Sequence, residues 1–209
     1  PFLNETIAKP EIDELLEPKI LVNATLFDET GNHNISNISN QDNLILKGNN
    51  LIALHSLKTN YAGKIKSILI DPPYYFSHKK AADSFTYNSS FKLSTWLTFM
   101  KNRLTIAKEL LADNGILAIT IGVDGSANLR LLADSIFNVH SEPNNFIGEI
   151  AWRKTDNQSN IGDFANVSDR ILLYRKNPNT KLFKLPLSDK AQKEYSYVDN
   201  IGNIADPIF

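Results

Sequence analysis

Short aliphatic runs alternate with stretches of helical periodicity in the middle of this chain, and that alternation is the strongest constraint on its fold. Residues 44–46, 68–70 and 116–121 are continuous apolar runs of strand length. Between them, apolar residues recur at helical spacing over 51–61 and 96–111. Continuous apolar strands that alternate with amphipathic helices are typical of a layered α/β fold with a mainly parallel sheet. We therefore predict this fold class.

Composition divides the chain into three parts. Residues 1–42 are polar and asparagine-rich, and 31–41 resemble a loop, so we expect a leader or linker there. Residues 43–176 contain the predicted strands and helices, and 177–209 would begin a further segment. The same patterns predict a third helix and two further strands over 129–137, 146–152 and 170–174. Since the chain starts at Pro1 and no closing element precedes its end, we expect a piece of a longer protein.

Composition also narrows the classes of function. With 42% hydrophobic residues among 209, the chain can bury a core. It contains no cysteine, which excludes disulfides and thiolate metal sites and fits a reducing compartment. No apolar run is long enough to span a bilayer, and no His, Asp and Glu cluster has metal-ligand spacing. The net charge of −1 means that any surface for nucleic acid must be a local patch.

The second aliphatic run ends in an unusual turn, SILIDPPYYF, at residues 67–76. In parallel sheets, ligands bind beyond the carboxyl ends of the strands, which is where Asp71 is expected. Pro72 and Pro73 restrict the backbone and have no N–H group, so the turn offers only acceptors, a carboxylate and rigid carbonyls. Tyr74 adds a flat aromatic face.

A planar group with an exocyclic amine matches these acceptors. Its amine can donate two hydrogen bonds, and its ring can stack on Tyr74. An adenine or cytosine taken out of its duplex has both properties. The alternative is that the two prolines only form a turn and that the tyrosine packs against it.

Four stretches of the chain resemble one known family, in the same order. They are 43–57, 65–74 with its Asp-Pro-Pro-Tyr motif, 87–138 and 145–154. The family is the modification (Mod) subunit of type III restriction–modification systems, an adenine-N6 DNA methyltransferase of the β arrangement. The resemblance implies a Rossmann-like methyltransferase fold, incomplete in this fragment, with a catalytic domain at 43–176 and the start of a target-recognition region at 177–209.

The resemblance implies a reaction and partners as well. S-adenosyl-L-methionine would donate the methyl group to a flipped adenine in double-stranded DNA. Asp71 and the Pro72 carbonyl would hold the N6 amine, with Pro73 completing the turn and Tyr74 stacking on the base. Asp71, Gly48 and Asn49 would lie at the cofactor. A homodimer, a partner restriction subunit with helicase and nuclease activity, and a bacterial cytoplasmic location are also implied.

The sequence departs from the family pattern in four places. Asn49 replaces an acid near the cofactor, and it is equally well explained as a helix N-cap. Tyr75 and Phe76 follow the motif where relatives have asparagine, and they would widen the aromatic wall towards DNA. Ser168 and Asp169 stand where many relatives carry histidine, and the sequence assigns them no role. The glycine-rich cofactor loop, Phe-x-Gly-x-Gly, does not occur.

Basic residues follow the turn directly, at His78, Lys79 and Lys80, among further aromatic residues. We expect this segment to contact DNA phosphates, although a solvated loop would have the same composition. Two rival functions stay open. One is a methyltransferase for cytosine N4 or for an RNA base, and the other is a DNA-binding fragment without catalysis.

Overall fold

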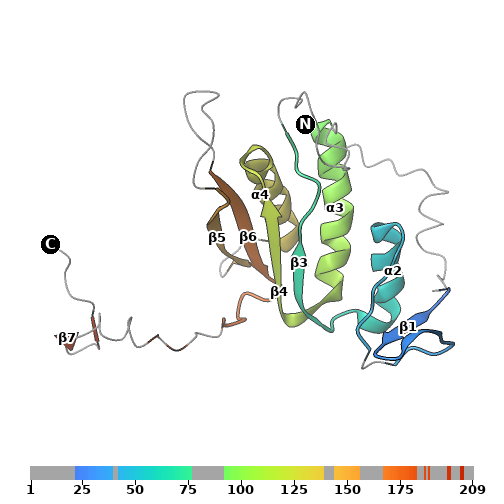
Figure 1. Cartoon of the computed structure of the whole chain (residues 1–209). Coiled ribbons are helices and arrows are strands. Elements are labelled where there is room, and N and C mark those ends of the chain that lie inside the picture. The colour runs from blue at the N-terminus through green and yellow to red at the C-terminus, as the bar shows by residue number, and fades with distance from the viewer. Residues whose placement is uncertain are drawn as a thin grey trace.

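The computed structural model describes residues 22–39, 42–76, 92–138, 144–155 and 167–182, with 186, 188, 197–198 and 203–204. Figure 1 shows these elements along the chain. The helices are α2 (Asn50–Tyr61), α3 (Leu93–Leu110) and α4 (Val123–Phe137). The strands are β1 (Thr25–Asp28), β2 (Gly31–Asn34), β3 (Ile65–Ile70), β4 (Leu111–Ile121), β5 (Phe146–Arg153), β6 (Ser168–Arg175), β7 (Tyr197–Val198) and β8 (Asn203–Ile204).

The central sheet has four strands in the order β3-β4-β6-β5. β3 and β4 are parallel, whereas β6 is antiparallel to both of its neighbours. The α/β class is thus confirmed. Among the described strands of this sheet, β3, β4 and β5 run in one direction and β6 runs against them, so the sheet is mixed, with one parallel pairing and two antiparallel ones. The physical reason is that β6 returns between β4 and β5 in the opposite direction, and an apolar run in a sequence does not reveal its direction.

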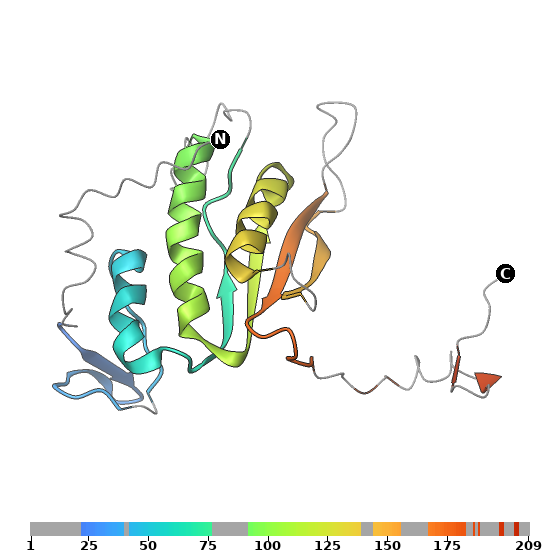
Figure 2. The same ribbon diagram turned by 180° about the vertical axis from the view of Figure 1, so that it is seen from behind.

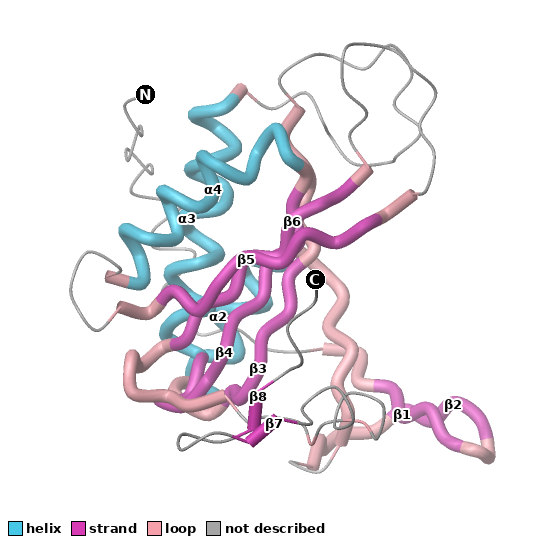
Figure 3. The backbone as a smooth tube through the Cα atoms, turned by 90° about the vertical axis from the view of Figure 1, so that its left-hand side faces the viewer, coloured by secondary structure: helices cyan, strands magenta, loops and turns pink. Residues whose placement is uncertain are grey.

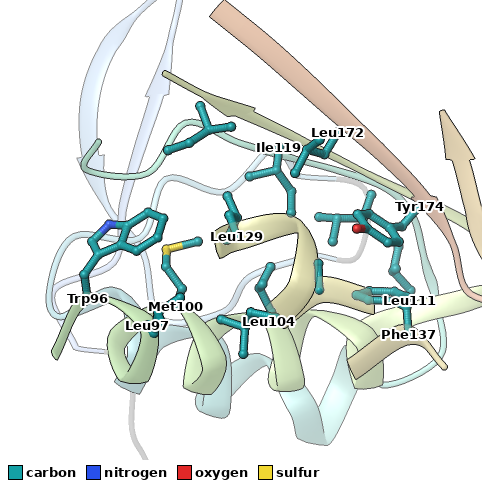
Figure 4. Packing of buried hydrophobic residues seen from close by; sticks show 14 residues of the cluster. Trp96, Leu97, Met100, Leu104, Leu111, Ile119, Leu129, Phe137, Leu172 and Tyr174 are labelled. Carbon is teal, nitrogen blue, oxygen red and sulfur yellow. The ribbon is translucent and has the colours of Figure 1, made fainter. Parts of the chain in front are cut away.

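The helices α3 and α4 cover one face of this sheet, and α2 packs against α3 (Figures 2 and 3). α3 forms because its apolar residues recur on one side, and that side is buried. Figure 4 shows the resulting core, with Trp96 at one end and Phe137 and Tyr174 at the other. Its buried members include Leu104 from α3 and Ile119 from β4. The core therefore runs along the face of the sheet that the helices cover, and its Trp96 end lies at the turn that follows β3.

The opposite face of the sheet is open in the described part of the chain. Leu69, Ile150 and Trp152 lie on this face and are 77%, 46% and 61% exposed. The continuous apolar runs led us to expect strands buried on both sides. For β3 this is wrong, since its residues alternate between half-buried and exposed positions.

Several local predictions can be compared with the structure. Asn49 caps α2 by accepting a hydrogen bond from the backbone N–H of Leu51 at 3.0 Å, as predicted. The helix ends just before Gly63, whose φ of +68° favours glycine. Ser94 precedes the helical pattern that starts at Trp96 and is a residue type that often caps helices, but α3 already begins at Leu93. Asn114 and Gly115 are likewise typical of a helix end, yet α3 ends at Leu110 and both residues lie in β4.

Two predictions near the N-terminus are wrong. The expected strand at 44–46 does not form, and Ile45 is 94% exposed, because this short run has no strand partner among the described residues. The expected loop at 31–41 contains β2, which pairs with β1 in an exposed hairpin. The short helix that the pattern at 11–21 suggests lies outside the described residues.

Candidate active site at the carboxyl end of β3

β3 delivers the Asp-Pro-Pro-Tyr turn to the edge of the sheet. Asp71 follows the last residue of the strand and is exposed, whereas Pro72 is buried. Because β3 and β4 are parallel with Ile70 opposite Ile119, Thr120 lies beside the start of the turn. Its hydroxyl Oγ1 is 3.0 Å from the Ile70 carbonyl and 3.1 Å from Asp71 Oδ1. The register of the parallel pair thus brings a hydroxyl donor to the candidate catalytic carboxylate.

Trp96, in the first turn of α3, holds the middle of the Asp-Pro-Pro-Tyr turn. Its indole Nε1–H donates a hydrogen bond to the Pro73 carbonyl at 2.8 Å, and its side chain is fully buried. Among the described residues, nothing donates to the Pro72 carbonyl. Of the two proline carbonyls, therefore, Pro73 already accepts a hydrogen bond, whereas the carbonyl of the buried Pro72 has no donor among the described residues.

The sequence predicts Trp96 only as a core residue, and this is confirmed. Its hydrogen bond to Pro73 was missed. The signal was that a buried indole N–H usually finds an acceptor, but the acceptor cannot be identified before the packing of α3 on the turn is known.

Tyr74 lies against the start of α4. A Cβ atom added at Gly122 would come within 3.0 Å of Tyr74 Cδ2 and 3.4 Å of Cε2, so the ring packs closely on this glycine. Burial and the carboxylate of Asp169, followed by that of Asp71, raise the pKa of Tyr74 to about 12, and a hydrogen bond with Thr120 lowers it. The phenol is therefore neutral at physiological pH.

Asp169 reaches the same edge from the opposite direction. It stands near the start of β6. Because β6 runs antiparallel to β4 and β5, it begins at the edge of the sheet where those two strands end. Lys154 Nζ pairs with Asp169 Oδ1 at 2.8 Å, and the carboxylate acts on the Tyr74 phenol as described above. Asp169, to which the sequence assigned no role, therefore lies close enough to Tyr74 to raise the pKa of its phenol.

The two aromatic residues after the motif take different positions. The Tyr75 ring lies 5.7 Å from that of Trp96 and packs against the core. The Phe76 ring is 6.5 Å from that of Tyr74. Phe76 thus extends the aromatic wall, whereas Tyr75 supports the tryptophan beneath it. The predicted DNA contacts His78, Lys79 and Lys80 lie outside the described residues.

Gly48 and Asn49 are not brought together with the turn. Asn50, the first residue of α2, accepts a hydrogen bond from Arg103 Nε at 2.9 Å. Arg103 lies seven residues beyond Trp96 on α3, about 10 Å along the helix axis. The Asn49 amide oxygen caps α2, which leaves its amide nitrogen as the group that could donate to a ligand. Their cofactor role stays a prediction.

The described residues contain no group of three or more His, Cys, Asp or Glu side chains that could hold a metal ion. Their helices are all too short or too polar to cross a membrane.

The chemistry available at this edge follows from these contacts. An exposed carboxylate, one carbonyl without a donor among the described residues and an aromatic face lie within four consecutive residues, Asp71 to Tyr74. Their backbone is fixed by two prolines and by the hydrogen bond from Trp96. Such a site can accept hydrogen bonds from an amine while stacking on the ring that carries it.

Comparison with known proteins gives type III Mod subunits and type II methyltransferases as relatives. The chain is 45% identical over 143 residues to the "Probable type III restriction-modification enzyme HindVI Mod subunit" of Haemophilus influenzae, covering 66% of this chain and 19% of that protein. It is 32% identical over 193 residues to the type III restriction–modification enzyme EcoP15I Mod subunit of Escherichia coli, covering 78% and 28%. The chain therefore spans about a fifth to a quarter of the length of these relatives.

Among solved structures, the PvuII DNA methyltransferase (cytosine-N4-specific) is similar to this chain over 60% of this chain's length and 47% of the length of the PvuII chain. The TM-score is 0.40, with 12% sequence identity. The DNA methylase family (N6_N4_Mtase) matches residues 65–207, from the first residue of β3 to beyond β8. Since this match includes the whole of the turn and more than half of the chain, the protein belongs to the DNA methylase family.

Proposed function

We propose that the protein transfers a methyl group from S-adenosyl-L-methionine to N6 of an adenine flipped out of double-stranded DNA. It would act as the modification subunit of a type III restriction–modification system, with a restriction subunit as its partner. The observation that carries the proposal is the acceptor turn, in which Asp71 is exposed and the Pro72 carbonyl has no donor among the described residues, while Trp96 donates to the Pro73 carbonyl. The names of the type III relatives support the same conclusion.

In this proposal the residues of the turn orient the base. The Asp71 carboxylate and the Pro72 carbonyl accept the two N–H groups of the adenine amine, which favours a tetrahedral nitrogen with an available lone pair. S-adenosyl-L-methionine, when bound, supplies the electrophilic methyl group. N6 would gain the methyl group that the sulfonium loses, and the extra proton would then pass from N6 to the solvent. Tyr74 holds the plane of the base by stacking, with a neutral phenol.

The residues present fit the cofactor in part. Asp71 is an exposed carboxylate at a strand end, which suits a ligand that carries an ammonium and a sulfonium group. Gly48 and the free amide nitrogen of Asn49 remain predicted contacts. We assign 43–176 to catalysis and 177–209 to the start of target recognition, and we place the protein in the bacterial cytoplasm as a homodimer.

The test is to incubate the full-length protein with DNA and S-adenosyl-L-methionine and to analyse the nucleosides by mass spectrometry. N6-methyladenine is expected, and sequencing of the modified DNA would give the target site. Finding only N4-methylcytosine, or modification of RNA alone, would replace adenine as the substrate. If calorimetry detected no cofactor binding either, DNA binding without catalysis would be the better conclusion.

Tyr74 offers a matched pair of variants for the stacking role. Tyr74→Ala removes the aromatic face and should weaken transition-state binding by about 1–3 kcal/mol. Tyr74→Phe retains the face and should keep most of the activity. Equal rates for Tyr74→Ala and wild type would remove this residue from the site.

A further inference from the structure

Thr120 is the described side chain that donates to the candidate catalytic carboxylate. It lies near the end of β4 and is half-buried, with Oγ1 at 3.1 Å from Asp71 Oδ1. The parallel pairing of β3 and β4 fixes this approach, because Ile70 and Ile119 are register partners and each is followed by one of the two residues. The contact thus depends on the sheet and not on a flexible loop.

A threonine hydroxyl has one hydrogen, and here two acceptors lie within reach. Oγ1 is 3.0 Å from the Ile70 carbonyl and 3.1 Å from Asp71 Oδ1. Both acceptors belong to consecutive residues where the strand becomes the turn. The hydroxyl therefore connects the last peptide of β3 with the side chain of Asp71 and restricts its rotation.

We propose that Thr120 is a positioning residue, which holds Asp71 so that its other oxygen, Oδ2, faces the amine of the target base. Among the described residues, Oδ2 receives no hydrogen bond, so it is available to a ligand. The inference rests on the proposed function, in which Asp71 accepts a hydrogen bond from the base. Thr120 would orient Asp71 without touching the base itself. The Thr120 hydroxyl also acts on Tyr74, since it lowers the pKa of the phenol against the larger effects that raise it.

The chain offers a matched pair of substitutions. Thr120→Val retains the branched shape and removes the hydroxyl, whereas Thr120→Ser retains the hydroxyl. In the full-length protein, Thr120→Val should lower kcat for methyl transfer roughly 10- to 100-fold, since hydrogen bonds to charged groups and small misplacements of catalytic groups have effects of this order. Thr120→Ser should stay within about threefold of wild type.

A second measurement does not require methyl transfer. Three-bond couplings from NMR should show one dominant side-chain rotamer of Asp71 in wild type and in Thr120→Ser, and averaged rotamers in Thr120→Val. DNA binding adds a third comparison: replacing the target adenine by 2-aminopurine, which lacks the amine at position 6, should weaken binding less in Thr120→Val than in wild type.

The outcomes separate this inference from the proposed function. A wild-type protein that does not methylate adenine overturns the proposed function, and the Asp71 rotamers still decide the role of Thr120. Unchanged rotamers and unchanged kcat in Thr120→Val overturn the inference alone. A loss of kcat in Thr120→Val that is fully explained by a lower melting temperature also overturns the inference. The Thr120 hydroxyl would then only stabilise the fold, by donating to the Ile70 carbonyl.

Discussion

The contact between Gly122 and Tyr74 makes a strong prediction for the substitution Gly122→Ala. An added Cβ would lie 3.0 Å from Tyr74 Cδ2 and 3.4 Å from Cε2. Contacts this close require the Tyr74 ring to move by a few tenths of an ångström. Because Tyr74 is proposed to stack on the target base, a shift of this size should lower kcat roughly threefold to tenfold.

Stability should change much less than activity. Gly122 has φ of −70° and ψ of 160°, which alanine adopts without strain. Replacing glycine by alanine at such a position stabilises a protein by about 0.4–1 kcal/mol, because it lowers the conformational entropy of the unfolded chain. Crowding the ring costs about 1–3 kcal/mol, and the exposed side of Tyr74 allows part of that to relax. The two effects offset each other, so the melting temperature should fall only slightly.

Gly148→Ala is the matched control, because no atom lies within 4 Å of a Cβ added there. The assay compares kcat of both variants with wild type in the full-length protein, and it follows 2-aminopurine fluorescence at the target position. Poorer stacking in Gly122→Ala should leave the flipped 2-aminopurine brighter. If Gly122→Ala were as active as Gly148→Ala and equally bright, the proposed role of this contact would be refuted.

Three further predictions concern the surroundings of the site. Trp96→Phe should leave the Pro73 carbonyl unpaired and destabilise the fold by about 1–3 kcal/mol, with a loss of kcat that exceeds that of an equally destabilised core variant. Tyr174→Phe, which removes a 2.7 Å hydrogen bond to Asp134 in the core, should cost about 1.5–3 kcal/mol in urea unfolding and leave kcat unchanged. The pKa of Tyr74 is raised to about 12 in the folded protein, above its usual value near 10. The stability that the neutral phenol contributes should therefore be complete below pH 10 and should be lost as the pH rises through about 12. The difference in phenolate absorbance between wild type and Tyr74→Phe checks this pKa.

The sequence predicts those parts of the site that are local in the chain. An apolar run followed by an acid and two prolines places Asp71 at a strand end, and β3 ends at Ile70 as expected. The N-cap role of Asn49 is equally local, since it depends only on the backbone two residues further on. In each case a few neighbouring residues determine the geometry, so no knowledge of the tertiary fold is required.

Contacts between distant segments could not be predicted in this way. Thr120 meets Asp71 because β4 lies next to β3 in a specific parallel register, and Trp96 meets Pro73 because α3 packs beneath the turn. The spacing of apolar residues along the sequence does not show that β3 and β4 become neighbours, or that α3 packs on the turn. The sequence indicates that Trp96 is buried, but its hydrogen-bond partner depends on the crossing of a helix over a turn 23 residues earlier in the chain.

The reversed direction of β6 determines how charge is distributed around Tyr74. A parallel strand at this place would end at the site, whereas β6 begins there and brings Asp169 to the phenol. Asp169 is paired with Lys154 at 2.8 Å, while Asp71 has no cationic partner among the described residues. Of the two carboxylates near Tyr74, Asp169 is therefore held in an ion pair. Asp71 keeps one oxygen, Oδ2, that receives no hydrogen bond from the described residues, and this difference supports Asp71 over Asp169 as the proposed acceptor for the amine.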